Sequence, residues 1–371
     1  MSNPNSLKIA VLNWRDLEHP KSGGAETYAL AVAKEFATRG HEVTYVTARH
    51  AGSSAKDRRD GYEIVRHGNA ATVYLRTLLW LLARRNTFDA VLDCSNGIGF
   101  FSPLVLGRRT KVSYLVHHIH TEQWSQQFSA PVAAIGRLLE GPITRLIYRH
   151  ARWIAVSEST AEGLRTRLKV PGQITIAHNG INQAPVGNPV QPSNGRVVFV
   201  GRPVVHKRLE LLIDAVAKSN QLSLDVMGHG VEMPAIAARA EKLGAKVHFW
   251  GFASDQQRDE IISNAAVLAI PSDHEGWGLV VLEAAALGVP SVGFDVPGVK
   301  DSIRNNQTGW ILDSRGAESE LVASLTEALE SAVVLAKNPV RRAEVAVECK
   351  RWAGQFTWAH TADVILNTWN K

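Results

Sequence analysis

Two glutamates, Glu275 and Glu283, stand eight residues apart in the stretch EGWGLVVLE. One continuous helix would place their carboxylates roughly 12 Å apart along its axis. Gly276 and Gly278 favour another arrangement, in which Glu275 lies in a loop and a helix begins near Gly278. Every residue from 279 to 287 except Glu283 is apolar, which predicts a helix without a solvated face. A carboxylate there needs a partner, because burial of an unpaired charge is strongly destabilising.

A nucleotide-sugar would supply that partner. The first amides of the predicted helix, at Leu279 and Val280, are free to donate hydrogen bonds to phosphate oxygens at the positive end of the helix dipole. Glu283, one turn further on, is placed to accept hydrogen bonds from two vicinal hydroxyls, as on a ribose. Glu275 is placed to do the same for sugar hydroxyls. The alternative is a pair of glutamates that cap the helix or form salt bridges.

Two cations flank a second predicted loop, in the stretch VGRPVVHKRLELLIDAV. A strand is expected to end at Gly201, with Arg202 and Lys207 in the loop before the next helix. Cations beside a helix N-terminus suit a diphosphate. The alternative is two ordinary surface charges.

These residues follow strands of an alternating strand and helix pattern, which predicts parallel sheets covered by helices. A helix is expected from Gly24 to about Arg39. The stretch 183–195 contains three prolines and two glycines and is interpreted as a linker. The predicted strands span 7–14, 41–48, 88–94, 111–118, 153–157 and 173–179 before the linker, and 196–201, 222–228, 246–251, 266–272 and 290–294 after it.

The composition is that of a globular protein, since 45% of the 371 residues are hydrophobic and 20% are charged. No apolar run approaches the roughly 20 residues of a membrane span. No signal peptide is visible, and the two cysteines are too few for a disulfide framework, so we expect a cytoplasmic protein.

The formal charge of +6 indicates an anionic partner. The basic residues are dispersed rather than clustered, which argues against nucleic-acid binding. Two stretches, 73–85 and 130–153, combine apolar residues with arginines. Each is open to two interpretations: a helix packed on the sheet, or a basic amphipathic helix in peripheral contact with an anionic membrane.

The motifs resemble those of the retaining glycosyltransferases of family 4. EGWGLVVLE is similar to the Glu-x7-Glu signature of that family, and VGRPVVHKRLELLIDA to its diphosphate loop, with Arg208 where a glycine is common. The resemblance extends over most of the chain through SGGAE (22–26), VSEST (156–160), AHNGIN (177–182), DVPGVKDSI (295–303) and NQTGWIL (306–312).

The resemblance implies the α/β fold called GT-B, in which two Rossmann-like domains face each other across a cleft. It implies an N-terminal acceptor-binding domain over 1–187 and a C-terminal nucleotide-sugar-binding domain over 188–352. The segment 353–371 would form a helix that crosses back to the N-terminal domain. The donor would be a UDP-, GDP- or dTDP-sugar, and the acceptor a glycan or glycolipid of the cell envelope.

The resemblance also implies roles for single residues. Arg202 and Lys207 would hold the donor diphosphate and neutralise the charge that develops as it leaves. Glu283 would bind the ribose and Glu275 the transferred sugar, and both Glu275 and the two cations are predicted to be catalytic. The other predicted donor-binding residues are Gly23, Gly24, Gly228, Phe252 beside the nucleobase, Gly276, Trp277, Gly278, Leu279 and Val280.

Three histidines occur within four residues in YLVHHIHTEQW, over 114–124. A zinc site is disfavoured, because no cysteine is near and a strand would alternate their faces. The resemblance implies that His117 faces the donor sugar or the acceptor and is catalytic. His118, His120, Glu122 and Trp124 would line the acceptor side. A structural histidine remains the alternative for each of the three.

The sequence contains no Asp-x-Asp pair of the kind that grips a metal-bound nucleotide-sugar. We therefore expect no metal cofactor. Three other functions are alternatives to this one. A nicotinamide-dependent dehydrogenase is disfavoured because GHGVEM and GIGFFS both lack the final glycine of G-x-G-x-x-G. A GT-B epimerase or phosphorylase and a non-catalytic nucleotide-sugar binding protein stay open.

Overall fold

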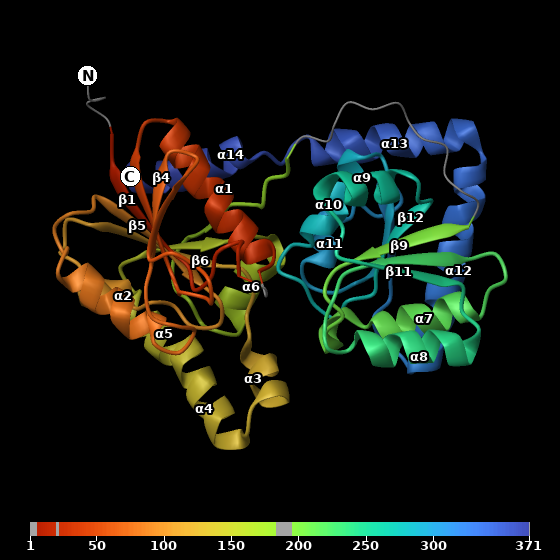
Figure 1. Ribbon diagram of the computed structural model, residues 1–371, viewed down its shortest axis with the longest axis horizontal. Helices are drawn as coiled ribbons and strands as arrows, with labels where there is room; N and C mark the ends of the chain where they lie inside the picture. Colours follow the sequence, from red (N-terminus) through yellow and green to blue (C-terminus); the bar gives the residue numbers. More distant parts are fainter. Residues whose placement is uncertain (1–5, 20–21, 183–194, 371) are drawn as a thin grey trace. The chain divides into compact units, whose positions relative to one another are not determined.

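The computed structural model describes residues 6–19, 22–182 and 195–370 of the chain, apart from the side chains of three residues in one helix, Glu122, Gln126 and Gln127. These residues form two compact units (Figure 1). Unit 1 comprises Met1–Gly180 and Thr357–Lys371, and unit 2 comprises Ile181–Phe356. The expected boundary at 187 and most of the expected linker lie outside the described residues. No described helix is long and apolar enough to cross a membrane.

Unit 1 is built on an eight-stranded sheet with the order β3-β4-β2-β1-β5-β6-β7-β8. All neighbouring strands are parallel except the antiparallel pair β3 and β4. The strands are β1 (Lys8–Leu12), β2 (Glu42–Thr47), β3 (Lys56–Arg59), β4 (Tyr62–Arg66), β5 (Ala90–Ser95), β6 (Lys111–Val116), β7 (Arg152–Ala155) and β8 (Ile174–Ile176).

Helical segments connect and follow these strands. They are α1 (Gly24–Thr38), α2 (Val73–Leu82), the 3-10 turn η1 (Ser102–Leu104), α3 (Thr121–Gln127), α4 (Ala130–Leu138), the π-helical turn η2 (Leu139–Ile143), α5 (Thr144–Ile147), α6 (Glu158–Thr166) and α14 (Trp358–Asn370). Helices α3 and α4 extend away from the sheet (Figure 1).

The C-terminal helix α14 completes the core of unit 1, where it lies beside α1 (Figure 1). The fully buried Trp369 packs on Phe36 with ring centroids 5.4 Å apart. Its Nε1 donates a hydrogen bond of 2.8 Å to Ser113 Oγ in β6. A large buried aromatic side chain with its one donor satisfied stabilises this docking.

Unit 2 is built on a six-stranded parallel sheet with the order β11-β10-β9-β12-β13-β14. The strands are β9 (Arg196–Val200), β10 (Ser223–Met227), β11 (Val247–Gly251), β12 (Val267–Ile270), β13 (Ser291–Phe294) and β14 (Gly309–Leu312). The helices are η3 (Val205–Lys207), α7 (Leu209–Ala217), α8 (Met233–Leu243), α9 (Asp255–Ser263), α10 (Leu279–Ala286), α11 (Val299–Ser302), α12 (Glu318–Lys337) and α13 (Pro339–Ala353).

The predicted strands and the helix that begins at Gly24 are confirmed, with ends that shift by at most three residues. The sequence analysis missed strand β14 and the hairpin of β3 and β4. Strand β3 reads Lys-Asp-Arg-Arg and shows no apolar alternation. It lies at the edge of the sheet, where charged side chains remain in water and discourage pairing with another chain.

Candidate functional site

The first part of the candidate site is the loop that follows β9 in unit 2. Arg202 is exposed, and no ion pair joins it to another residue of the described ranges. Lys207 ends the turn η3, and its side chain is 19% exposed. Arg208 then adopts a left-handed conformation with φ of 49°. That conformation favours glycine, which explains why a glycine would be common at this position.

The Lys207 ammonium group meets the Glu275 carboxylate. Nζ lies 2.5 Å from Oε1, and Ser272 Oγ donates a hydrogen bond of 2.7 Å to the same oxygen. Burial by itself would raise the pKa of Glu275, but the neighbouring Lys207 charge and these hydrogen bonds hold it below the ordinary value. Glu275 is therefore a carboxylate at neutral pH. Its two side-chain hydrogen bonds within the described residues are both to Oε1, which leaves Oε2 available to a ligand hydroxyl.

The backbone of Glu275 is fixed by the loop between β13 and α11. Glu275 N donates a hydrogen bond of 3.0 Å to Pro297 O. Gly298, with φ of 80°, lies so close that an added Cβ would stand 2.4 Å from Glu275 O. Glu275 therefore lies in a loop, as the sequence predicted, and the structure shows that this loop is tightly packed.

Helix α10 begins at Leu279 after Gly278, whose φ is 80°, which confirms the predicted start. The prediction of a helix without a solvated face holds in part, because no residue of α10 is exposed but one side of it is half-buried. The half-buried residues of the helix are Leu279, Val280, Glu283 and Ala286. The Glu283 side chain is 25% exposed, so its charge is less isolated than the sequence suggested.

Glu283 has a protein cation nearby. Its Oε1 lies 3.7 Å from Arg258 Nη1, on helix α9. This is too long for a hydrogen bond, so the carboxylate keeps its capacity to accept. Burial raises the pKa of Glu283 above its ordinary value, and the Arg258 charge only partly opposes this. Glu275 thus forms the salt bridge that was the alternative interpretation of the two glutamates. The ion pair of Glu283 is longer and weaker.

Two histidines that the sequence analysis did not single out adjoin this pair. His206 and His274 stack with ring centroids 4.7 Å apart. Burial, and then the neighbouring His274, lower the pKa of His206 to about 4. His206 is therefore neutral at pH 7 and adds no charge beside Lys207. His206 directly precedes Lys207 and His274 directly precedes Glu275 in the sequence. This position beside the two motifs was the signal that could have identified them.

Phe252 and Gly228 follow the neighbouring strands β11 and β10. The Phe252 ring is 83% exposed, and its centroid lies 6.2 Å from that of His229. An exposed aromatic face beside the carboxyl ends of a parallel sheet is available for a nucleobase. Gly228 has φ of 152°, and an added Cβ would lie 1.9 Å from Gly201 O. Only glycine fits there without displacing the strand end that leads to Arg202.

Gly228→Ala is expected to destabilise the protein by about 2–4 kcal/mol, from backbone strain and overpacking. Gly244→Ala is a matched control, because Gly244 also has positive φ, at 66°, but no atom lies within 4 Å of its added Cβ. The control should lose only about 1 kcal/mol. Urea denaturation of both variants measures the difference, and equal losses would contradict the packing argument.

In unit 1, the predicted glycine-rich loop leads into α1. Gly23 caps the helix, and its N–H donates a hydrogen bond of 2.7 Å to Glu26 Oε2. Glu26 is only 4% exposed. An added Cβ on Gly24 would have no atom within 4 Å, so the backbone here is open to a close approach.

His117 lies directly after β6 and is 5% exposed. Its ring contacts Tyr28 edge-on, at 5.2 Å between centroids. Burial, and then the neighbouring His118, lower its pKa to about 3, so the ring is neutral at pH 7. Within the part of the chain that the structure describes, Nε2 has no hydrogen-bond partner. A purely structural role would leave that atom unsatisfied, which favours a ligand-facing role.

Residues predicted to line the acceptor side are organised by Glu140, which the sequence analysis missed. This buried carboxylate in η2 accepts hydrogen bonds from His120 N at 2.5 Å, from Thr121 Oγ1 at 3.2 Å and from Trp124 Nε1 at 3.0 Å. His118 packs on His120 with ring centroids 3.8 Å apart. The Glu122 side chain lies outside the described residues. No sequence signal distinguished Glu140 from a surface glutamate.

Two family profiles match the chain. The family described as Glycosyltransferase Family 4 matches residues 22–184, and the one described as Glycosyl transferases group 1 matches residues 186–345. The chain belongs to glycosyltransferase family 4. The resemblance seen in the sequence is therefore confirmed.

One relative of this family 4 chain is the D-inositol 3-phosphate glycosyltransferase of Rhodococcus erythropolis. The two are 31% identical over 195 residues, which are 49% of this chain and 42% of the relative. The alignment thus spans less than half of either protein.

Solved structures share the GT-B fold. A sucrose-phosphate synthase from Thermosynechococcus elongatus superposes with a TM-score of 0.79 at 17% identity, over 98% of both chains. Anabaena HepE, solved in complex with UDP and glucose, gives a TM-score of 0.70 at 18% identity, over 98% of this chain and 99% of the other. At these identities the likeness establishes the fold, and the predicted fold class is confirmed.

Proposed function

We propose that this family 4 protein transfers a sugar, with retention of anomeric configuration, from a UDP-, GDP- or dTDP-sugar to a glycan or glycolipid acceptor. The observation that carries the proposal is the cluster of Lys207, Glu275 and Ser272, with the exposed Arg202 in the same loop as Lys207. Cations and a sugar-binding carboxylate lie at the carboxyl ends of the strands, where open α/β sheets bind ligands.

The roles follow from the chemistry of each group. Arg202 and Lys207 neutralise the diphosphate as the bond to the sugar breaks. Glu275, kept ionised by Lys207, orients sugar hydroxyls, and Glu283 accepts hydrogen bonds from the ribose. The neutral His117 offers Nε2 to the sugar or to the acceptor. Retention rests on the family resemblance. UDP is supported by its presence in the HepE structure, which shares the fold.

The decisive assay is donor turnover. A thermal-shift panel of UDP-, GDP-, dTDP- and ADP-sugars selects the donor, and release of the nucleotide is then measured without acceptor. Slow hydrolysis of the selected donor that depends on Lys207 supports an enzyme. Tight donor binding without any release, even with a panel of glycan and glycolipid acceptors, would instead support a non-catalytic binding protein.

Turnover is expected to persist after chelation of divalent ions. Arg202, Lys207 and the amides of α10 bind the diphosphate and neutralise its charge in place of a metal ion. The measurement is the initial rate with excess EDTA, with a Mg²⁺-supplemented reaction as the control. Complete loss of turnover that Mg²⁺ or Mn²⁺ restores would contradict a metal-independent step.

Peripheral contact with an anionic membrane belongs to the same proposal, as does a cytoplasmic location. Helix α2 buries Val73, Thr77 and Leu81, so one side packs on unit 1 as an ordinary domain helix. Its other side exposes Leu75 and Leu79, which are 63% and 57% exposed. Helix α4 likewise exposes Val132, Ile135 and Leu138. Exposed apolar side chains near arginines suit the interface of an anionic bilayer.

The protein is expected to sediment with vesicles containing anionic phospholipid at low salt and to remain in solution with neutral vesicles. Leu75→Glu together with Leu79→Glu should abolish sedimentation, because both side chains point away from the core. Val334→Glu in unit 2, at a residue 59% exposed, is the matched control. Absence of wild-type binding at low salt would dispose of this contact.

A further inference from the structure

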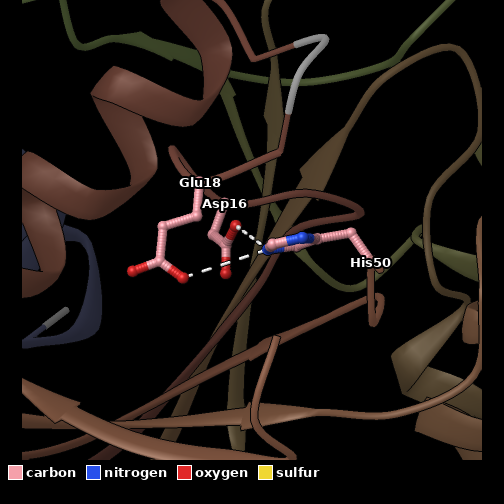
Figure 2. Close-up of side chains that lie close together, drawn as sticks. All are labelled: Asp16, Glu18 and His50. Carbon is pink, nitrogen blue, oxygen red and sulfur yellow. Dashed lines mark ion pairs between the residues drawn. The ribbon is translucent and has the colours of Figure 1, made fainter. Parts of the chain in front are cut away.

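A carboxylate and histidine cluster that serves no role in the proposed transfer lies in unit 1 (Figure 2). Asp16 and Glu18 follow β1, and His50 follows the neighbouring parallel strand β2. His50 Nε2 lies 3.6 Å from Asp16 Oδ1 and 3.9 Å from Glu18 Oε2. The sequence analysis did not single out these residues, because 31 positions or more separate the histidine from the carboxylates.

The other nitrogen of His50 determines the form of its ring. Nδ1 lies 3.1 Å from Ala51 O. A carbonyl oxygen only accepts, so Nδ1 carries the hydrogen, and in the neutral ring Nε2 presents a lone pair. That lone pair faces two carboxylates, which is repulsive unless a cation lies between them. Metal-binding histidines are typically oriented in this way, with the other ring nitrogen donating to a carbonyl.

Two atoms of the cluster are buried without a hydrogen-bond partner in the described residues. Asp16 is 1% exposed, and neither Asp16 Oδ1 nor His50 Nε2 has a hydrogen-bond partner within residues 6–19, 22–182 and 195–370. Buried polar atoms are seldom left unpaired. Both atoms point to the same place, which is the space between the three side chains in Figure 2.

Two arginines contact the carboxylates, and one of them, Arg66, also binds Glu18 Oε2, the oxygen that faces His50. Arg66 Nε donates a hydrogen bond of 2.5 Å to Asp16 Oδ2, and its Nη2 donates one of 3.1 Å to Glu18 Oε2. Arg59 pairs with Glu18 Oε1. These contacts fix the orientation of the carboxylates and leave Asp16 Oδ1 free. Their positive charge also weakens attraction for a dication, so we expect a site of moderate affinity.

We propose that Asp16, Glu18 and His50 bind a divalent transition-metal ion, with Zn²⁺ as the best match to one imidazole and two carboxylates. Ligand atoms at about 2.0–2.1 Å from a tetrahedral zinc lie roughly 3.3 Å from each other. The two separations from His50 Nε2 are 3.6 and 3.9 Å, and all three ligand atoms lie within 4.8 Å of one another, so binding requires the three side chains to draw together. Water fills the fourth position. The ion ties the residues that follow β1 to the loop after β2, and it has no part in the chemistry at the diphosphate.

The test titrates Zn²⁺, as its chloride, into the full chain after removal of metals with EDTA. Calorimetry should show that the wild type binds one equivalent of Zn²⁺. The His50→Gln variant should bind no Zn²⁺ or bind it at least about tenfold more weakly. Glu18→Gln, at a side chain 38% exposed, should weaken it as well without threatening the fold. His19→Gln is the matched control, because its ring lies 5.9 Å from that of His50 in the same region. It should bind as the wild type does.

Equal stoichiometry and affinity in the wild type and both cluster variants would overturn the proposal. So would nitrogen NMR showing His50 protonated at both ring nitrogens with Zn²⁺ in excess, because the cation between the carboxylates would then be the imidazolium itself. If circular dichroism shows that His50→Gln does not fold, the Zn²⁺ affinities of Glu18→Gln and His19→Gln are compared instead. Weaker binding in Glu18→Gln alone supports the proposal. The EDTA turnover assay in His50→Gln separates this site from any metal at the diphosphate.

Discussion

Replacing Lys207 with methionine is expected to lower kcat by about 10²–10³-fold, the usual effect of removing one group that stabilises developing charge. Methionine keeps most of the length of the side chain and removes the ammonium group. Negative charge grows on the diphosphate as the sugar leaves, so the loss should fall on turnover more than on donor binding. Steady-state kinetics with the selected donor measures both.

The Lys207 variant has a second consequence, at Glu275. Lys207 holds the pKa of Glu275 below its ordinary value against the effect of burial. Without the ammonium group, burial dominates and this pKa rises. Because the ionised carboxylate is the active form, the acid limb of the pH–rate profile should move to higher pH in the variant. Wild-type Glu275 loses its charge only as pH falls below the ordinary range of a glutamate.

A double-mutant comparison separates the two effects. Glu275→Gln alone removes the charge partner, and the Lys207→Met, Glu275→Gln pair removes both, so non-additive losses measure the coupling. Lys218→Met, at an exposed residue after α7, controls for loss of a lysine in unit 2. Wild-type turnover in the Lys207 variant would contradict its assignment to the diphosphate.

Much of the fold could be predicted from local sequence patterns. The alternation of apolar strands with helical segments gave both parallel sheets, because a strand buried on both faces is a continuous apolar run. Gly278, which stands before an apolar run, correctly predicted the start of α10 and the position of Glu275 in a loop. These features depend on short stretches of chain, where steric and packing rules act directly.

The partners of the charged residues could not be predicted from local sequence patterns. Lys207 and Glu275 are 68 positions apart, and their contact requires β9 and β12 to be neighbours in the sheet. Glu140 resembles a surface glutamate until the π-helical turn buries it beside Trp124. The helix carrying Arg258 was not separately predicted, so the cation near Glu283 was unforeseen.

Glu283→Ala is expected to weaken binding of the nucleoside diphosphate by about 10- to 100-fold, since a hydrogen bond to a charged group is worth about 1.5–3 kcal/mol. The 3.7 Å separation from Arg258 leaves the carboxylate free to accept from the ribose hydroxyls. Because burial raises the pKa of Glu283, wild-type affinity should fall as pH decreases through that raised value, where the carboxylate gains a proton. Calorimetry over a pH series measures both effects.

A nucleotide lacking the 2′-hydroxyl distinguishes a ribose contact from a structural ion pair. If the preferred nucleotide is UDP or GDP, the wild type should bind its 2′-deoxy form more weakly, and Glu283→Ala should bind the two forms alike. If Glu283 served only Arg258, then Glu283→Ala and Arg258→Ala would lower Tm by similar amounts and both would keep the wild-type preference for the ribose. That preference surviving in Glu283→Ala would place the nucleoside elsewhere, because no other described carboxylate shares the half-buried side of α10.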